Sequence, residues 1–469
     1  MTKRSEEVDD TTRWGSALLM ARARADVVAR ALSGIVGVVF VVGVGVLITV
    51  SGWSRVRQNW DAGEPWFTGF QAASIATPIA ALIAAGAAIT TAKWGLNAER
   101  DRRRVERRDT TERTLRDRFH ELVKLLAADE LRAREGAAHA IVALADDWTT
   151  HYRHDPHKAQ SEQQVCVEVL ISQLRDPLPD PLNATTYSQA TAFKHTIQKL
   201  VRSRLGVAGI SHPVPGVWSS LDLIFDGCVF HDLDFSDCVL SGDAVSFNGA
   251  SFNGERTSFD GAYLDGQRVS FDGARFNTNA VSFSDAQFIG WRASFDGTRF
   301  ISESVSFSSA LFTGSDASFV RAGFAAETVS FNGASFVGAS VSFEDAHFAG
   351  GYVSFNGSHF TARTWFDGAH FAAEIVSFDG SHFTGKFVSF ADSRFTSRGV
   401  GFRFEELDVK QQVLLGDVVS TLPRDDFAPL MNAKTVIASG SRFGVSANDV
   451  PACQTCRVLT FAFERMSPR

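Results

Sequence analysis

The sequence contains few cysteines, five among 469 residues. This number is too small for a fold built on disulfides, and Cys166, Cys228 and Cys238 are dispersed, as in proteins of a reduced cytosol. Cys453 and Cys456 form one CxxC, which allows a redox pair or half of a zinc site. Because no second pair follows at a suitable spacing, an inert pair is the simplest interpretation.

An excess of positive charge is also missing. The net charge is −7 and the isoelectric point is near 6.0, which argues against a nucleic-acid binder that works through a globally basic surface. Wholesale disorder is excluded too, since 45% of the residues are apolar. A chain of this length has room for about two to four domains.

Familiar catalytic motifs are absent. The sequence has no GxxxxGK, GxSxG or HExxH, and the acids of its repeats stand at turn positions rather than as a paired acid and base. We therefore predict no enzymatic activity and no cofactor. The segment HYRHDPH spaces His151, His154 and His157 three apart, but Asp155-Pro156 favours an exposed polar loop over a zinc site.

Two long uncharged runs stand near the beginning of the chain. Residues 31–50 are a run of 20, about the length of a helix that crosses a hydrocarbon core of ~30 Å. Residues 67–92 form a second run, in which alanine recurs every four residues and allows close helix packing. The runs predict a transmembrane hairpin. A cleaved signal peptide is disfavoured, because the first run begins late and a second follows.

Aromatic and basic residues flank these runs. Tryptophans favour the membrane interface, and residues 93–108 hold seven Lys/Arg against three acids. Both termini of this multi-pass cell-membrane protein should therefore lie in the cytoplasm. The basic run is most simply a solvated flank, with contact to anionic membrane lipid as the alternative. The predicted membrane-flanking residues are Trp53, Trp66, Trp94, Arg102, Arg103 and Arg104.

Helical spacing follows the hairpin. Leu115, Phe119 and Leu122 mark an apolar face, and residues 97–127 contain no Pro or Gly, which predicts a charged helical stalk. The Pro-rich DPLPDPLN separates the last two helices. The expected helices cover residues 96–127, 129–148, 159–175 and 187–205.

A phenylalanine ladder fills the second half of the chain. Residues 225, 230, 235 and 240 (Phe, Phe, Phe, Leu) are five apart, and from Phe247 to Phe402 successive rungs are 5 or 7 residues apart, with a single 6 between Phe360 and Phe366. Of the 40 Phe, 29 lie on this ladder. Two residues before each rung stands Val, Ala, Thr or Ser, so both side chains point to the same face of an extended segment. The predicted structural core includes Phe247, Phe252, Phe271, Phe276, Val329, Phe331, Ala334, Phe336, Phe343 and Phe348.

One such face cannot bury itself, but stacked coils can, which predicts a solenoid with a fixed sequence period. Asn-Gly and Asp-Gly pairs after many rungs supply turns at the corners. If four rungs close a coil, most coils contain 24 residues, and the two longer gaps leave small protruding loops such as NGERT, IGWR and TARTW.

The strings IFDGCVFHDLDFSDCVL (residues 224–240) and VSFNGASF (residues 329–336) resemble pentapeptide-repeat proteins. The resemblance implies a right-handed quadrilateral β-helix over about residues 221–404, here with 5+7 spacing. The alanine-rich residues 115–148 are similar to the segment that joins spans and repeats in bacterial membrane-anchored members with two N-terminal transmembrane helices.

The expected organisation is therefore mixed: a transmembrane α-hairpin, a small α-helical domain and a β-helix. C-terminal residues are expected to cap the open end of the β-helix. The expected segments are a cytoplasmic tail (1–30), the hairpin (31–94), the helical stalk and domain (95–215), the β-helix (221–403) and the capping region (404–469).

The outward positions of the repeat carry serines and two columns of histidines. Serine precedes most rungs that follow a 7-residue gap, which predicts a solvated β surface. Stacking at this period places His347 beside His370 and His359 beside His382. Paired imidazoles can bind a transition metal or sense pH, but without an acidic partner fixed by the spacing, surface decoration is the simpler interpretation and no metal is predicted.

These patterns favour a non-catalytic scaffold that presents its rod to an unidentified cytoplasmic protein partner. Residues 221–403 carry 21 acids against 11 Lys/Arg, and the resemblance implies a second possibility, an acidic DNA mimic that binds a topoisomerase. The third is a metal or pH sensor that uses the histidine columns. Nucleic-acid binding is not expected, and the sequence leaves the oligomeric state open.

Overall fold

The computed structural model describes residues 69–209 and 212–401, residue 426, and four short strands between residues 406 and 437. The chain divides into two compact units after Thr110. Residues 1–68 and 438–469 lie outside the described residues, and so do the first predicted span and the CxxC.

The long helix α2 (Gly69–Leu126) begins in the first unit. It contains residues 69–92 of the second predicted span, and its exposed charges pair along the helix, as between Arg102 and Glu106 (3.0 Å) and between Arg103 and Glu99 (2.7 Å). The predicted charged stalk is thus helical. Among the described helices, none is both long enough and apolar enough to cross a membrane.

Three further helices form a small helical domain in the second unit: α3 (Leu131–His151), α4 (Pro156–Ser172) and α5 (Ala184–Arg202). Asp155 and Asn183 accept hydrogen bonds from the backbone N–H groups of Lys158 and Thr186, so they cap α4 and α5. These caps explain why both helices begin three residues before the predicted starts. Ile141, Leu144 and Trp148 are buried between the helices.

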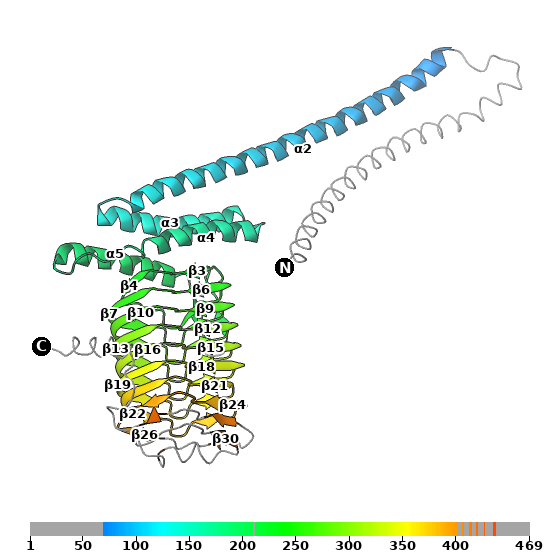
Figure 1. The fold of residues 1–469 in the computed structure, drawn as a ribbon. Coiled ribbons are helices and arrows are strands. Elements are labelled where there is room, and N and C mark those ends of the chain that lie inside the picture. Colours follow the sequence, from blue (N-terminus) through cyan, green and yellow to red (C-terminus); the bar gives the residue numbers. More distant parts are fainter. Residues whose placement is uncertain are drawn as a thin grey trace, which may run out of the picture. The chain divides into compact units, whose positions relative to one another are not determined.

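A β-solenoid of about 7 turns follows, of the right-handed type, which confirms the predicted solenoid. Its coils stack as parallel strands in three sheets (Figure 1). Sheet A contains β1 (Gly206–Ala208), β2 (Pro213–Val214), β5 (Cys238–Leu240), β8 (Tyr263–Leu264), β11 (Gln287–Phe288), β14 (Leu311–Phe312), β17 (Ser335–Phe336), β20 (His359–Phe360), β23 (His382–Phe383) and β27 (Glu406–Leu407).

Sheet B contains β3 (Leu223–Ile224), β6 (Ala244–Ser246), β9 (Arg268–Ser270), β12 (Arg292–Ser294), β15 (Asp316–Ser318), β18 (Ser340–Ser342), β21 (Arg363–Trp365), β24 (Phe387–Ser389), β28 (Gln412–Leu414) and β30 (Thr435–Ile437). Sheet C contains β4 (Val229–His231), β7 (Ser251–Ser258), β10 (Arg275–Ser282), β13 (Arg299–Ser306), β16 (Gly323–Ser330), β19 (His347–Ser354), β22 (His370–Ser377), β25 (Arg394–Phe395), β26 (Gly399–Gly401) and β29 (Val419–Ser420).

The ladder rungs stack inside the solenoid. Phe247 lies over Phe271 with ring centroids 4.7 Å apart and nearly parallel planes, and Phe271 lies over Phe295 at 4.9 Å. Rings on neighbouring faces meet edge to face, as Phe259 does with Phe271 at 5.4 Å. Both arrangements are favourable for aromatic pairs. All ten predicted core residues are buried, each at most 1% exposed.

The two widened corners of the coil differ from each other. In sheet C the chain stays extended through the corner, so NGERT lies inside the eight-residue strand β7 and the parallel register continues from Arg275 opposite Ser251 to Ser282 opposite Ser258. The predicted protruding loop is therefore wrong at this corner. The extended backbone pairs with the coils on both sides, and the spacing of rungs cannot reveal this pairing.

The other widened corner, between sheets A and B, turns outside the strands and carries a glycine column: Gly266, Gly290, Gly314, Gly338 and Gly385. A Cβ on Gly290 would lie 1.5 Å from the carbonyl oxygen of Gly266, and one on Gly314 would lie 2.0 Å from that of Gly290. The column therefore needs glycine because successive coils approach too closely for a side chain. Ala362 occupies the equivalent position in the coil where the rungs Phe360 and Phe366 are six rather than seven residues apart.

The helical domain closes the first coil of the solenoid. Side chains of α5 donate to backbone carbonyl oxygens of that coil: Gln198 Nε2 to His231 (3.0 Å) and Arg202 to Asp234 (2.6 Å) and Ser236 (3.1 Å). Gln164 of α4 does the same to Asp222 (2.8 Å). An open strand edge would leave these acceptors unpaired, so the helices form a polar cap.

Strands also continue beyond residue 403. β27 pairs with β23, β28 with β24 and β29 with β25, all in parallel. These strands extend the three sheets in register with the coils before them. The capping role of residues 404–469 stays a prediction.

Candidate functional site

The serines before the rungs form hydrogen-bonded ladders between coils. In sheet B, the hydroxyls of Ser270 and Ser294 donate to the side-chain oxygens of Asn248 and Asp272 in the preceding coil. The same oxygen of Asp272 accepts the backbone N–H of Asp296 at 3.0 Å. These serines are buried or half-buried, so the expected solvated serine surface is wrong: the hydroxyls are used within the fold.

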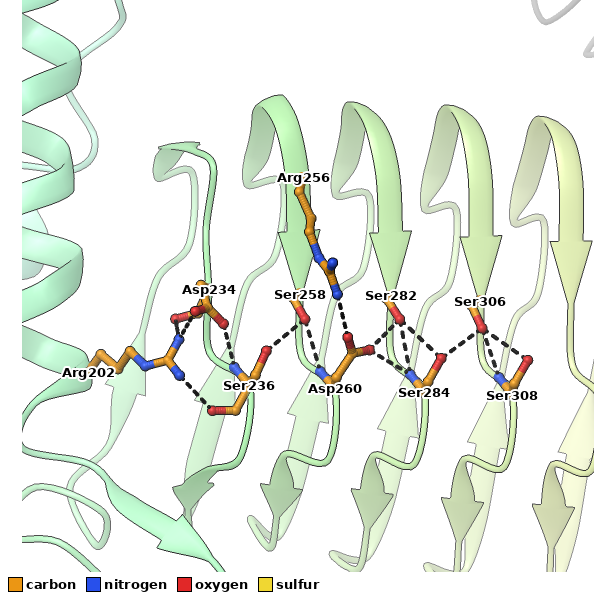
Figure 2. Close-up of polar contacts among 10 residues, drawn as sticks. All are labelled: Arg202, Asp234, Ser236, Arg256, Ser258, Asp260, Ser282, Ser284, Ser306 and Ser308. Carbon is orange, nitrogen blue, oxygen red and sulfur yellow. Dashed lines mark hydrogen bonds and ion pairs between the residues drawn. The ribbon is translucent and has the colours of Figure 1, made fainter.

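A second ladder begins at the helical cap (Figure 2). Arg202 contacts Asp234 and Ser236, and the hydroxyl of Ser236 meets that of Ser258 at 2.7 Å. The ladder continues through Asp260, which accepts from Ser282 and from the backbone N–H of Ser284 at 3.1 Å. Polar groups on this side therefore join the cap to the coils and leave little capacity for a ligand.

One region of the outer surface is different. A pocket of about 300 Å³ opens on the outer face of sheet B over the first coils; we call it the sheet B trough. Its serines are used in the ladder, whereas the exposed arginines of β9 and β12, Arg268 and Arg292, stack in parallel register along it. Arg292 pairs with Asp296 at 3.1 Å. The backbone N–H of Arg268 donates to the carbonyl of Asp243 (3.4 Å), but among the described residues none forms a hydrogen bond or ion pair with its guanidinium.

An exposed tryptophan adjoins the trough. Trp291 immediately precedes Arg292 at the glycine-column corner, and 68% of it is exposed. Val337, two coils farther on at the same corner, is 50% exposed. Exposed large apolar side chains near an arginine whose guanidinium has no acidic partner, here Arg268 on the preceding coil, are typical of protein-binding surfaces.

The histidine columns form as predicted, but with different environments. His347 and His370 pair across β19 and β22 with ring centroids 4.8 Å apart, and only 2% and 7% of them are exposed. Burial lowers the pKa of each to about 4. His359 and His382 stack at 4.4 Å on sheet A, where His359 is exposed.

Neither column gathers three possible metal ligands among the described residues. Two neutral imidazoles without a carboxylate are a poor metal site, and burial shields the first pair from solvent. The interpretation of His347 and His370 as surface decoration is wrong, because both side chains are covered.

A family model described as pentapeptide repeats (9 copies) matches residues 225–267, which include the first coils of the solenoid. The coil seen in the structure repeats the same unit. Together they support a pentapeptide-repeat β-solenoid protein. No match was found among curated proteins or among solved structures.

The pentapeptide-repeat solenoid also brings together a cluster that the sequence did not suggest. His195 of α5 lies beside His231 and Asp232 of the first coil, with one possible ligand atom from each within 4.8 Å of the others. Residues 195 and 231 belong to different predicted domains, and no motif links them. Only the docking of the cap on the first coil joins them, so a single sequence carries no signal for the cluster.

The cysteines of the described part of the chain are buried in and near the cap. Burial raises the pKa of Cys166 and Cys228 to about 12 and that of Cys238 to about 11. A thiol with so high a pKa is a poor nucleophile and a poor metal ligand at neutral pH. Cys453 and Cys456 lie outside the described residues.

Some of the predicted membrane-flanking residues also lie outside the described part of the chain. Trp53 and Trp66 lie outside the described residues, and Trp94 is 61% exposed on α2. Arg102 and Arg103 are exposed and form the helical ion pairs given above, while Arg104 lies 3.9 Å from Asp101. Of the HYRHDPH histidines, His151 ends α3 and packs against Tyr152, and His154 accepts a hydrogen bond from Arg153.

Proposed function

We propose that the protein is a non-catalytic scaffold, anchored to a membrane by its N-terminal region, whose solenoid binds a cytoplasmic protein partner. The observation that carries this proposal is the exposure of Trp291, one residue before Arg292 in the sheet B trough, together with the exposed guanidinium of Arg268 on the preceding coil. Elsewhere the serines and many turn acids bond within the solenoid. We therefore assign partner binding to this edge of the sheet B trough.

The chemistry of the edge indicates the kind of partner. Tryptophan and arginine carry a large share of binding energy in protein interfaces. The guanidinium of Arg268 suits a carboxylate, and the indole of Trp291 suits an apolar side chain close to that carboxylate. An extended acidic segment with an apolar residue meets both requirements. A trough of about 300 Å³ admits a few of its side chains.

Partner binding can be tested with the full-length protein in its native host. A photo-crosslinking amino acid at Ser315, on the same corner as Trp291, captures the partner, which is identified and purified. Trp291→Ala and Arg268→Ala should each weaken the affinity for that partner about tenfold or more. Leu182→Ala is the matched control, since Leu182 is 92% exposed in the loop before α5.

Unchanged affinity in both variants would contradict the proposed surface. If the partner is a topoisomerase, and reversal of surface acids rather than Trp291→Ala abolishes binding, the protein is a DNA mimic instead. Loss of capture in the Leu182→Ala control would mean that the assay reports folding rather than recognition.

The membrane anchor is proposed from the sequence of residues 31–50 and 67–92. It is tested by alkaline washing of membranes, which should leave the protein in the membrane pellet. Cysteine introduced at Gln58, between the two runs, should react with an impermeant maleimide added to whole cells, whereas Ser315→Cys should react only after lysis. Release by alkaline washing, or equal labelling of both sites in whole cells, would rule out the two-span topology.

A further inference from the structure

The cap and the first coil meet at three metal-ligand side chains. His195 comes from α5, His231 from β4 and Asp232 from the residue after β4. All three are half-buried, and one ligand atom from each lies within 4.8 Å of the others. The carboxylate that the histidine columns lack is therefore present here.

A hydrogen bond orients the imidazole ring of His195. Its Nε2 lies 2.8 Å from the backbone carbonyl oxygen of His231. A carbonyl only accepts, so Nε2 donates this hydrogen bond and Nδ1 is the ring nitrogen left for a metal ion. Imidazoles that bind metal ions usually donate their second N–H to a carbonyl or carboxylate in this way. The ring is thus oriented.

His231 and Asp232 have an unusual mutual geometry. Nδ1 of His231 is buried and lies 3.0 Å from Oδ2 of Asp232. Even so, that nitrogen makes no hydrogen bond with any part of the chain that the structure describes. Two ligands of one tetrahedral zinc ion stand about 3.3 Å apart. A separation of 3.0 Å is also short enough for a hydrogen bond, so it is the unused Nδ1, rather than the distance, that leaves His231 and Asp232 open to share one ion.

Asp232 is held in place by the next coil. Its Oδ1 accepts the backbone N–H groups of Glu255 (2.5 Å) and Arg256 (3.2 Å), which leaves Oδ2 on the side of His231. The backbone of Asp232 has a φ of 49°, a left-handed conformation that Asp and Asn tolerate. The carboxylate is therefore preorganised before any ion arrives.

The cluster is accessible and its charges are compatible with an ion. His195 and Asp232 line a pocket of about 400 Å³ together with Lys199, Arg202 and Asp234. Arg202 pairs with Asp234, so its charge is compensated. Two imidazoles and one carboxylate suit Zn²⁺ or a neighbouring transition metal rather than Mg²⁺ or Ca²⁺, which prefer oxygen ligands only.

We propose that His195, His231 and Asp232 bind one Zn²⁺-class ion that fastens helix α5 to the first coil, with water from the pocket completing the coordination. The ligand atoms lie within 4.8 Å of one another, so side-chain movements of about 1–1.5 Å bring them to the spacing of zinc ligands. The ion would add a link between α5 and the first coil to the hydrogen bonds that Gln198 and Arg202 already make there.

The test uses purified, tag-free full-length protein in detergent, stripped with a chelator and titrated with Zn²⁺ against a chromophoric competitor. One equivalent should bind and raise the unfolding temperature. Asp232→Asn keeps the left-handed backbone and the acceptor for Glu255, and His195→Gln keeps a donor for the His231 carbonyl. Each variant should fold and should bind Zn²⁺ at least about tenfold more weakly.

His359→Gln is the control and should bind like the parent protein. Substitution by Co²⁺ gives a second readout, since the visible absorption of a four-coordinate site should be lost in Asp232→Asn. The proposal is wrong if the parent binds no Zn²⁺ below millimolar concentration, or if both variants bind as the parent does. It is also wrong if His359→Gln alone removes binding, which would place the ion on the histidine column.

Discussion

At the scale of residues, position on a strand does not by itself decide burial. His347 and His370 stand at outward positions of sheet C, yet only 2% and 7% of them are exposed. Burial is the largest cause of their low pKa, and for His370 the neighbouring His347 and the cation of Arg394 act in the same direction. Nε2 of His370 also lies 3.2 Å from the hydroxyl of Thr396. The folded protein therefore holds both imidazoles neutral.

Acid should weaken the solenoid for this reason. Below pH 6.5 the unfolded chain takes up protons on these histidines, whereas the folded chain does so only near pH 4. The contribution of these histidines to the free energy of unfolding should thus be fully present above pH 6.5. It should fall as the pH drops toward 4, by at most about 3 kcal/mol for each imidazole. Urea unfolding between pH 4 and 8 measures this slope.

Replacing the two histidines measures how much of the pH dependence of the free energy of unfolding they cause. His347→Asn and His370→Asn should flatten the fall between pH 6.5 and 4, whatever their effect at pH 7.5. Phe348→Leu, a core change without an ionisable group, should lower stability by a similar amount at every pH. An unchanged slope in the double histidine variant would show that other groups cause the acid sensitivity.

At the scale of elements, the glycine column is the tightest contact between coils. Gly290→Ala places a Cβ 1.5 Å from the carbonyl oxygen of Gly266, so the two corners must separate. We expect a loss of about 1–3 kcal/mol in the free energy of unfolding, measured by chemical denaturation. Gly399→Ala in β26 is the matched control, because a Cβ there meets nothing within 4 Å; equal losses in both would refute the steric explanation.

The polar cap makes a separate prediction. Arg202→Met keeps the apolar stem but removes the donors to the carbonyls of Asp234 and Ser236, at a cost of about 2 kcal/mol. Hydrogen exchange should accelerate in β4 and β5, the first strands beneath the cap. Lys199→Met on the same helix, where the side chain is exposed, should leave exchange in these strands unchanged; acceleration in both variants would contradict a specific role for Arg202.

The sequence predicts the repeating part of this structure better than the unique part. A sum of one 5-residue and one 7-residue gap, taken twice, correctly places Arg275 opposite Arg299 and Gln287 opposite Leu311. With the single 6-residue gap between Phe360 and Phe366 counted, the spacing also pairs His347 with His370, 23 residues on. These successes arise because a solenoid repeats each inward position at one fixed interval.

Other features could not be read from spacing. The strand through the sheet C corner depends on hydrogen bonds to neighbouring coils, which have no counterpart in the order of side chains. The use of Arg202 as a cap and the meeting of His195 with His231 depend on how the helices dock. A periodic pattern reports which residues share a face, but not what covers that face.

At the scale of the whole solenoid, the two widened corners differ, so only a whole coil can be removed without placing residues at the wrong corner. Removing residues 295–318 deletes one 24-residue coil and joins Ser294 to Phe319. Because Ser294 and Ser318 are register partners, every later residue should move up one coil and keep its face. We expect a folded protein with cooperative unfolding and a modest loss of stability, measured by circular dichroism and thermal unfolding.

Removing only residues 295–306 tests why the whole coil is needed. The shorter deletion preserves the alternation of 5-residue and 7-residue gaps, so rung spacing alone predicts an equally good fold. It would, however, move Ala326 into the glycine column opposite Gly290, where a Cβ on the present occupant, Gly314, would lie 2.0 Å from a carbonyl oxygen. The half-coil variant should therefore be much less stable than the full-coil variant, and equal stability would show that the two corners are interchangeable.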